Sequence, residues 1–404
     1  MTLRVAVLTM YEPAEPGSQL QRAFLRIGGL TIARQQLALA LEMRCERIVC
    51  IAPHLFPEIV ELQHLAEAAK APFHVISDAR ALVGLVTAVD EVIVLGDGLF
   101  VSIPDAAALL EVGQAVLVQP IEQGLVAGFE RIDLNHAGAA AMRLPGRLVE
   151  RLAELPADVD AASALQRIAL QAGIRQKAIP TPGQDGVFWT LVRSETEAHA
   201  IEPQWIRQRT KGEGALSPSS GLALLGVRSF GPALLHAGSG AMGLVVAATV
   251  LVVLALGAGW FLLVPLGLVL VGLAWLLREA AVMLSRIEND TRRDQKGLDA
   301  KQVFGAICDG AIILLAAWGT EIHPGQHFVD RLFPPFMLVA LLRILPRLIS
   351  PRWAGWLGDR GLLALGLALA ILAGPGSAII HVAATVVAIA GIVVPSRQTR
   401  LTRP

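Results

Sequence analysis

Hydrophobic and polar positions divide the chain into a first half with short apolar runs and a second half with long ones. The short runs fall at 3–10, 47–52, 73–76 and 91–95, and each is followed by a turn or a stretch with helical spacing. Short apolar runs without alternation are typical of strands that are buried on both faces. Strands that alternate with helices indicate a parallel sheet covered by helices, so residues 1–180 are predicted to form an α/β, Rossmann-like soluble domain.

The helices of this first half are predicted from apolar residues at three- and four-residue spacing. They fall at Thr31–Met43, Glu58–Lys70 and Ala79–Ala88, and the stretch 128–174 is also predicted to be helical. The pair Gly28-Gly29 indicates a turn just before the first helix.

The second half is predicted to be an all-α, six-helix transmembrane domain over residues 239–396. Its six apolar segments are Gly240–Leu256, Trp260–Leu277, Phe304–Ile322, Phe333–Leu348, Gly361–Leu372 and Ser377–Val394. Residues 181–238 are expected to be a linker, and its end, 221–238, has the pattern of an amphipathic helix in the membrane interface or of an ordinary surface helix. Residues 397–404 form a basic tail.

Composition supports a membrane part and excludes a nucleic-acid partner. Mean hydropathy is +0.57 and only 17% of residues are charged. The formal net charge is zero, so nothing favours nucleic acid. Basic residues gather after the second and fourth apolar segments and in the tail, which predicts a multi-pass protein of the inner (cytoplasmic) membrane with both termini cytoplasmic. The first apolar run is too short for a signal peptide, so the soluble domain is expected in the cytoplasm.

Two aspartates stand out as candidate functional residues. Asp97 follows a strand directly, in the sequence Gly-Asp-Gly, and ligands of α/β sheets bind at the carboxyl ends of strands. The alternative for Asp97 is an ordinary turn residue. Asp309 lies inside the third apolar segment, where a carboxylate costs roughly 2.5–3.5 kcal/mol and marks a functional site. Asp97 is thus well placed to hold a metal or a phosphate, and Asp309 is a candidate functional residue. The family resemblances given below imply Mg²⁺ or Mn²⁺ at both.

The cysteines and histidines carry weaker signals. Cys45, Cys50 and Cys308 have no metal-ligand spacing, and we interpret Cys45 and Cys50 as small buried hydrophobic residues. His323 and His327 are interpreted as part of a solvated loop rather than as a metal pair. For His381 we expect a hydrogen bond to a neighbouring helix rather than a ligand role.

The first half resembles the sugar-nucleotide-type nucleotidyltransferases. The likeness lies in the segments RIGGLTIARQQLALALEMRCERIVCIAP and DEVIVLGDGLFV. It implies a substrate-binding turn at Gly28 and Gly29 and a metal-binding aspartate at Asp97.

The loop after the first strand departs from that family, which has a glycine-rich loop with a basic residue there. This chain reads TMYEPAEPGSQLQR, with Glu12 and Glu15 where a triphosphate would be repelled. Arg22 or Arg26 would have to supply the positive charge.

The second half resembles the CDP-alcohol phosphotransferases, whose aspartates bind two metal ions. Ser285-Arg286 corresponds to the Ala-Arg pair of the motif, and Gly305 with Asp309 to its Gly-x3-Asp. The resemblance implies substrate binding at Arg286 and Gly305 and a metal at Asp309. The remaining positions differ, since Arg278, Ala281 and Ile313 stand in place of aspartates. Other carboxylates would then be recruited from Glu279, Glu288, Asp290 or Asp294.

Together the halves resemble bifunctional fusions that make a CDP-alcohol and transfer its headgroup, of the inositol-phosphate type. This implies phospholipid or polar-lipid headgroup synthesis, with membrane lipid and a nucleotide or CDP-alcohol as partners and a homodimer as the expected assembly. Because both motifs are incomplete, three hypotheses stay open. The chain is an active transferase, a non-catalytic pseudoenzyme scaffold, or a lipid-handling or transport component.

Overall fold

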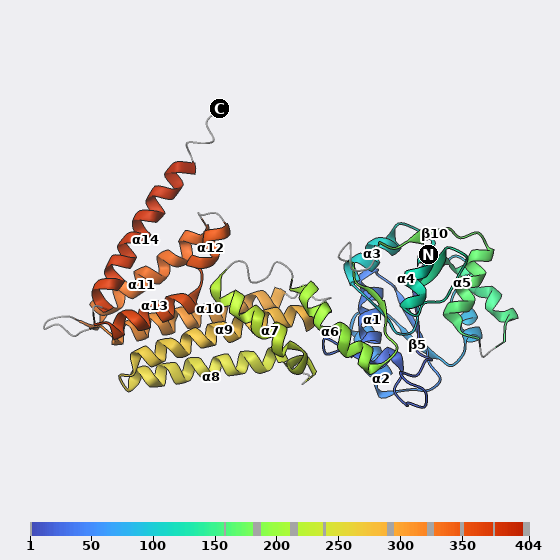
Figure 1. The fold of residues 1–404 in the computed structure, drawn as a ribbon, viewed down its shortest axis with the longest axis horizontal. Helices are drawn as coiled ribbons and strands as arrows, with labels where there is room; N and C mark the ends of the chain where they lie inside the picture. Colours follow the sequence, from blue (N-terminus) through green and yellow to red (C-terminus); the bar gives the residue numbers. More distant parts are fainter. Residues whose placement is uncertain are drawn as a thin grey trace. The chain divides into compact units, whose positions relative to one another are not determined.

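The structure, a computed structural model, divides the chain into two compact units, Met1–Gln208 and Arg209–Pro404 (Figure 1). The residues that the structure describes are 2–156, 159–180, 187–210, 217–236, 240–288, 295–320, 327–347, 351–374 and 376–398.

A seven-stranded sheet forms the centre of the first unit. Its order is β10-β8-β9-β6-β1-β4-β5, and β9 is antiparallel to both of its neighbours while the other pairs are parallel. In register, Val7 of β1 lies opposite Val49 of β4 and Val94 of β6. The strands are β1 (Arg4–Thr9), β4 (Arg47–Ile51), β5 (Phe73–Ile76), β6 (Glu91–Leu95), β8 (Ala115–Pro120), β9 (His136–Pro145) and β10 (Gln176–Ala178).

The predicted α/β fold is confirmed, but the prediction of helix across 128–174 is wrong in its first part. Residues His136–Pro145 form β9, inserted between β6 and β8. The run is rich in alanine, which favours helix locally, but pairing with strands on both sides overrides this preference. Its Gly138 packs closely against Gln166, since a Cβ there would lie 2.7 Å from Gln166 Oε1 and the glutamine side chain would have to move.

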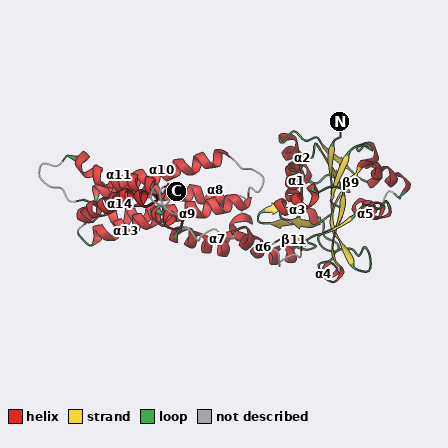
Figure 2. Cartoon of the chain, turned by 90° about the horizontal axis from the view of Figure 1, so that it is seen from above, coloured by secondary structure: helices red, strands yellow, loops and turns green. Residues whose placement is uncertain are grey.

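Helices cover both faces of the sheet, as predicted (Figure 2). Alternate residues of each central strand enter opposite cores. Ala6 and Leu8 pack with α1 (Ile32–Glu42), α2 (Pro57–Ala68) and α3 (Ile103–Glu111). Val5 and Val7 pack with α5 (Ala161–Gln171) and two 3₁₀ helices, η2 (Ala79–Gly84) and η3 (Gly146–Glu154).

Part of the predicted linker packs within the first unit. Its strand β11 (Trp189–Leu191) pairs with β7 (Leu99–Val101), and helix α6 (Glu195–Arg209) follows. Phe100, Phe188 and Trp205 form edge-to-face ring contacts with centroids 4.9–5.7 Å apart, which fix α6 against the unit. The smaller elements are η1 (Arg22–Phe24), β2 (Arg26–Ile27), β3 (Leu30–Thr31) and α4 (Ile121–Val126).

The second unit is helical throughout its described residues. Its core is formed by apolar residues of α8, α9, α10, α11, α13 and α14, including Val271, Leu315 and Leu367. The elements are α7 (Pro218–His236), α8 (Gly240–Trp260), α9 (Val264–Glu288), α10 (Gln295–Trp318), α11 (Phe328–Ile344), η4 (Leu345–Arg347), α12 (Pro351–Leu357), α13 (Arg360–Leu372) and α14 (Gly376–Gln398).

The prediction of six transmembrane helices is confirmed only in part. Each predicted segment overlaps a helix, but within the described residues only two helices, Gly240–Trp260 and Val264–Ile287, are long and apolar enough to cross a membrane. The apolar parts of α10, α13 and α14 are shorter, at Gln302–Trp318, Arg360–Leu372 and Gly376–Ala390. The apolar sequence of helix α11 is broken up by charged residues and by two prolines, Pro334 and Pro335.

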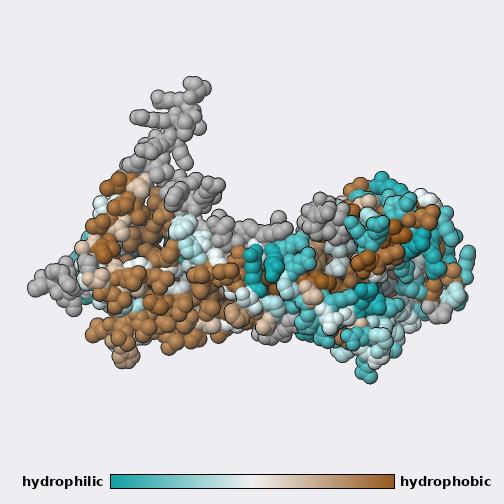
Figure 3. Space-filling view, in the orientation of Figure 1, coloured by the Kyte–Doolittle hydropathy of each residue, from teal (hydrophilic) through white to brown (hydrophobic). Residues whose placement is uncertain are grey.

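The described part of the helical unit that faces the viewer in Figure 3 is largely apolar. On α8, Val246, Val250 and Val253 are more than half exposed and lie on one face of the helix. A continuous exposed apolar face is typical of contact with a membrane or a partner.

Candidate functional site

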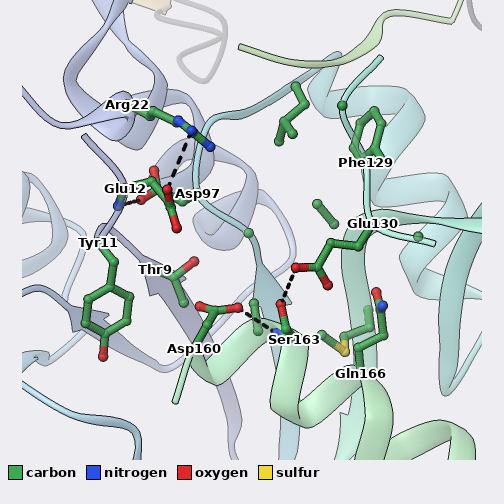
Figure 4. A pocket seen from close by; sticks show the side chains of 17 residues that line it. Thr9, Tyr11, Glu12, Arg22, Asp97, Phe129, Glu130, Asp160, Ser163 and Gln166 are labelled. Atoms are coloured by element: carbon green, nitrogen blue, oxygen red, sulfur yellow. Dashed lines mark hydrogen bonds and ion pairs between the residues drawn. The ribbon is translucent and has the colours of Figure 1, made fainter. Parts of the chain in front are cut away.

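A cavity of about 190 Å³ lies where β1 and β6 end (Figure 4). Tyr11 and Glu12 enter it from the loop after β1, and Asp97 from the loop after β6. Asp160 and Ser163 reach the cavity from the start of α5. Asp97 lies at the carboxyl edge of the sheet, which is the position at which ligands bind in α/β folds.

Helix α1 holds the loop that carries Asp97. Gln36 Nε2 donates to the carbonyl oxygens of Gly96 at 2.8 Å and Leu99 at 3.0 Å, on either side of Asp97. Gly98 has a φ of +71°, and a Cβ there would lie 2.5 Å from the Val192 carbonyl oxygen. Glycine is therefore required after Asp97, and the loop has one defined conformation.

Asp97 is incompletely satisfied within the protein. Its Oδ2 accepts a 2.7 Å hydrogen bond from the Glu12 backbone N–H, while its Oδ1 is buried without a hydrogen-bond partner. Burial raises the pKa of Asp97 to about 7, because desolvation disfavours the charged form; Arg22 and the backbone hydrogen bonds oppose the rise. A buried carboxylate oxygen without a partner is costly unless a ligand supplies one.

Arg22 is the basic residue of the cavity. Its guanidinium lies 3.5 Å from the Glu12 carboxylate, and its Nε is buried without a hydrogen-bond partner. Arg26, the other predicted phosphate-binding residue, is exposed on β2 and does not line this cavity. Among the described residues that line the cavity, this one arginine faces four carboxylates, those of Glu12, Asp97, Glu130 and Asp160.

The opposite wall is polar and fixed by hydrogen bonds (Figure 4). Asp160 caps α5 by accepting from the Ser163 backbone N–H at 2.8 Å, and Ser163 Oγ donates to Glu130 at 2.9 Å. Burial raises the pKa of Tyr11 to about 12, so its hydroxyl stays a neutral donor. Gln166 completes this wall.

Sequence reasoning missed this opposite wall. Glu130, Asp160, Ser163 and Gln166 all lie in the stretch that was predicted to be one helical run. The available signal was Asp160, which precedes an apolar helix with Ser163 at the position of a cap partner.

The geometry fits a divalent cation only when the ligand itself supplies oxygens. Among the described residues, no group of three His, Cys, Asp or Glu side chains is arranged to hold a metal alone. Mg²⁺ is commonly held by one or two carboxylates together with water and substrate phosphates. Asp97 Oδ1 provides one such oxygen, so Asp97 would hold the cation and the bound ligand would complete its shell.

The predicted substrate-binding turn is present but lies elsewhere. Gly28 and Gly29 connect β2 to β3 with φ values of +62° and +78°, as expected for a two-residue hairpin turn. The Gly28 N–H donates a 2.8 Å hydrogen bond to Glu202 of α6, which is 1% exposed. Neither glycine is among the residues that line the cavity.

Asp309 is not available to bind a divalent cation, because both of its carboxylate oxygens accept hydrogen bonds from arginines. Arg360 Nε lies 2.6 Å from Oδ1, and Arg343 Nη1 lies 3.3 Å from Oδ2. The residue is 6% exposed. A cation at this carboxylate would have to displace two guanidinium groups, so we derive no metal chemistry there.

The other predicted residues of the helical unit fall into three groups. Gly305 lines a cavity that also holds Asp309, whereas Arg286 is exposed near the end of α9 and does not line it. Glu279 is paired with Arg278. The side chain of Glu288, and residues Asp290 and Asp294, lie outside what the structure describes, as does His323.

The histidine and cysteine predictions are settled in part. His327 is the N-cap of α11, forming a capping box with Asp330. The interhelical bond predicted for His381 is replaced by one within α14, where Nδ1 donates to the Ser377 carbonyl oxygen at 2.7 Å. Cys45 and Cys50 are buried as predicted, and burial raises the pKa of each thiol to about 12.

Three solved structures resemble the first half of this chain. No family model and no curated relative matches. A putative glucose-1-phosphate thymidylyltransferase from Bacillus anthracis is 12% identical with a TM-score of 0.40, over 50% of this chain and 94% of that one. The inositol-1-phosphate CTP transferase from T. maritima is 12% identical with a TM-score of 0.38, over 49% and 92%.

A UDP-glucose pyrophosphorylase from Acinetobacter baumanii is 11% identical with a TM-score of 0.37, over 51% of this chain and 94% of that one. All three are named as enzymes that act on nucleotides or sugar nucleotides. Values this low do not establish a family, a ligand or an activity for this chain.

Proposed function

We propose that the chain is a membrane-bound protein of polar-lipid headgroup synthesis whose α/β unit binds a nucleotide or CDP-alcohol together with Mg²⁺ or Mn²⁺. One observation carries the proposal. Asp97 Oδ1 is buried without a partner beside a cavity at the carboxyl edge of the sheet. A ligand-borne cation would supply the missing contact and stabilise the charged form of Asp97.

The charges of the cavity make binding of phosphate depend on the cation. Four carboxylates face one arginine, so a diphosphate or triphosphate alone would be repelled. A divalent cation bound between Asp97 and the phosphates would replace this repulsion by attraction. Arg22, whose Nε has no partner, would then contact a phosphate oxygen.

The size and lining of the cavity favour the polar end of such a ligand. Its volume of about 190 Å³ is below the roughly 300–1,000 Å³ of sites that enclose a whole drug-sized ligand. The hydroxyl, amide and carboxylate groups of Tyr11, Ser163, Gln166 and Glu130 suit the hydroxyls of a sugar or polyol. The rest of the ligand would extend from the open mouth of the cavity.

Membrane association is proposed from the helical unit. Helices α8 and α9 have the length and composition of spans, and α8 exposes an apolar face. With the basic loops, this favours a multi-pass protein of the inner (cytoplasmic) membrane with the α/β unit and both termini in the cytoplasm. The chain is expected to stay in the membrane fraction after an alkaline carbonate wash, and its release would contradict this placement.

A second candidate is a non-catalytic relative that binds the headgroup precursor and regulates or scaffolds a partner enzyme. The observation that favours it is the pairing of Asp309 with two arginines, which leaves no described carboxylate pair for a two-metal transfer in the helical unit. The two candidates share the binding step at Asp97 and differ only in whether group transfer follows.

The test is binding of radiolabelled CTP and of a CDP-alcohol to the detergent-purified full chain, with and without Mg²⁺ or Mn²⁺. Metal-dependent binding that is lost in Asp97→Asn supports the proposal. Asp105→Asn is the matched control, because Asp105 lies on α3 outside the cavity. Absence of metal-dependent binding by the folded wild-type chain, or equal loss in both variants, would overturn it.

A further inference from the structure

A second cavity, in the helical unit, gathers arginines from three helices. It has a volume of about 390 Å³ and lies between α9, α10, α11 and the start of α13. Arg278, Arg343 and Arg360 line it, and Asp309 is the acidic residue among the lining positions. Such a gathering of arginines is unusual beside an apolar core, because arginine is rarely buried unless it is paired.

Arg360 has a structural role in this cluster. Its Nε and Nη2 reach Asp309 at 2.6 and 3.5 Å, and its Nη1 lies 3.4 Å from the carbonyl oxygens of Leu357 and Gly358. The side chain is 7% exposed. Arg360 and Asp309 therefore form a satisfied buried pair that ties α13 to α10.

Arg343 is different, because half of its side chain is exposed. Its ion pair with Asp309 uses one Nη atom at 3.3 Å, and the side chain is 50% exposed. A guanidinium carries five N–H donors, so Arg343 retains donors for a further acceptor. Since Asp309 is already held by Arg360, it neutralises Arg343 only in part.

Arg278 adds a flat, oriented guanidinium to the same cavity. It stacks on Trp275 with Cζ 4.4 Å from the ring centroid and donates to Glu279. Among the described residues that line the cavity, three are arginines and one is a carboxylate, so the described lining is rich in positive charge. In surroundings of low polarity, an excess charge is stabilised by a bound counter-ion.

We propose that this cavity binds the phosphate or phosphodiester group of a ligand, with Arg343 as its main contact. Planar guanidinium groups bind phosphate oxygens in pairs, which an ammonium cannot do. Space is available at the wall formed by Gly305, where an added Cβ would meet nothing within 4 Å. The site is separate from the Asp97 cavity and stands whether or not nucleotide binds there.

Two sources could supply such a group, a membrane phospholipid or a soluble phosphate compound. The first probe is inorganic phosphate and pyrophosphate, titrated calorimetrically against the detergent-solubilised full chain. The second is retention of phosphatidylglycerol, measured by native mass spectrometry after release from nanodiscs of phosphatidylcholine and phosphatidylglycerol in equal parts. Binding of the soluble anions assigns the site to a soluble phosphate, and retention of phosphatidylglycerol alone assigns it to a lipid headgroup.

Four variants distinguish anion binding in this cavity from non-specific attraction to exposed basic residues. Arg343→Gln is expected to weaken binding roughly tenfold or more, which is the effect of losing one charge-assisted contact. Arg343→Lys should recover it only in part. Gly305→Leu fills the cavity without changing charge and should also weaken binding. Arg286→Gln, which removes an exposed arginine outside the cavity, should leave binding unchanged.

Absence of binding in both arms would overturn the proposal, as would equal weakening in Arg343→Gln and Arg286→Gln. Folding of each variant is checked by its thermal midpoint, since Arg360 still pairs with Asp309 when Arg343 is replaced. Asp97→Asn should leave this binding unchanged, which separates failure here from failure of the nucleotide site.

Discussion

Asp97 and Asp309 look alike in the sequence and differ in the structure. Each follows an apolar stretch and precedes a glycine. In the α/β unit, Asp97 keeps a buried oxygen without a partner, whereas in the helical unit both oxygens of Asp309 contact arginines. The counter-charges around a carboxylate therefore decide its chemistry. Asp97 is suited to receive a cation, and Asp309 is suited to fix arginines in place.

The largest effect that tests this contrast is expected from Arg360→Ala. Removing Arg360 leaves the buried Asp309 with only the half-exposed Arg343 as its ionic partner, so the free energy of unfolding should fall by up to roughly 3–5 kcal/mol. The measurement is thermal or denaturant unfolding of the detergent-solubilised chain. Replacing both residues, in Asp309→Leu with Arg360→Leu, should recover much of the loss.

If Asp309 were instead a strained metal ligand, its replacement by alanine would stabilise the chain. We expect Asp309→Ala to destabilise it, because Arg360 is then buried without its carboxylate. A gain in stability would reverse the contrast between the two aspartates.

Asp97→Asn is expected to have the opposite sign. The raised pKa means that the folded chain holds a proton on Asp97 between pH 4 and 7 that the unfolded chain has released. The contribution of Asp97 to stability is therefore favourable at low pH and falls as pH rises from about 4 to about 7. Asparagine lacks this dependence, so at pH 8 the variant should be more stable by roughly 1–3 kcal/mol, the cost of a buried unsatisfied group.

The measurement is the unfolding free energy of wild type and Asp97→Asn at pH 5 and pH 8 without divalent cations. Asp105→Asn serves again as control, and its difference from wild type should not change with pH in this manner. A destabilised Asp97→Asn at pH 8 would mean that the carboxylate is satisfied within the protein.

The pH dependence of cation binding should report the same raised pKa of Asp97. A cation at Asp97 displaces a proton below pH 7, so its affinity should fall about tenfold for each pH unit below 7 and level off above it. Mn²⁺ binding, followed by electron paramagnetic resonance in the presence of CDP-alcohol, measures this slope. An affinity that is independent of pH between 5 and 7 would remove Asp97 from the cation site.

The strands of the α/β unit were predictable because their signals are local. Phe73–Ile76 and Glu91–Leu95 are bounded as predicted, since each is a short apolar run closed by polar residues. β9 was not predictable in this way. Its alanine-rich sequence has no strand pattern, and its conformation depends on pairing with β6 and β8.

The site shows the same division between local and distant information. Asp97 was found because strand, aspartate and glycine are contiguous. The arginines that pair with Asp309 lie 34 and 51 residues away along the chain, so the sequence pattern around Asp309 contained no sign of them. The likeness to an Asp-containing motif therefore suggested a metal where the fold supplies guanidinium groups.

The smallest effect is expected from Gln36→Met, which tests how the fold holds Asp97 in place. Gln36 Nε2 donates to the carbonyl oxygens on both sides of Asp97, and the side chain is buried. Methionine keeps the length and removes both donors, so stability should fall by about 1–2 kcal/mol. If the loop positions the carboxylate, metal-dependent ligand binding should weaken by more than this small loss of stability alone explains. Gln35→Met is the matched control, because Gln35 contacts the Val101 carbonyl beyond the loop. Equal binding by the two variants would mean that the turn at Gly98, rather than helix α1, keeps Asp97 in the cavity.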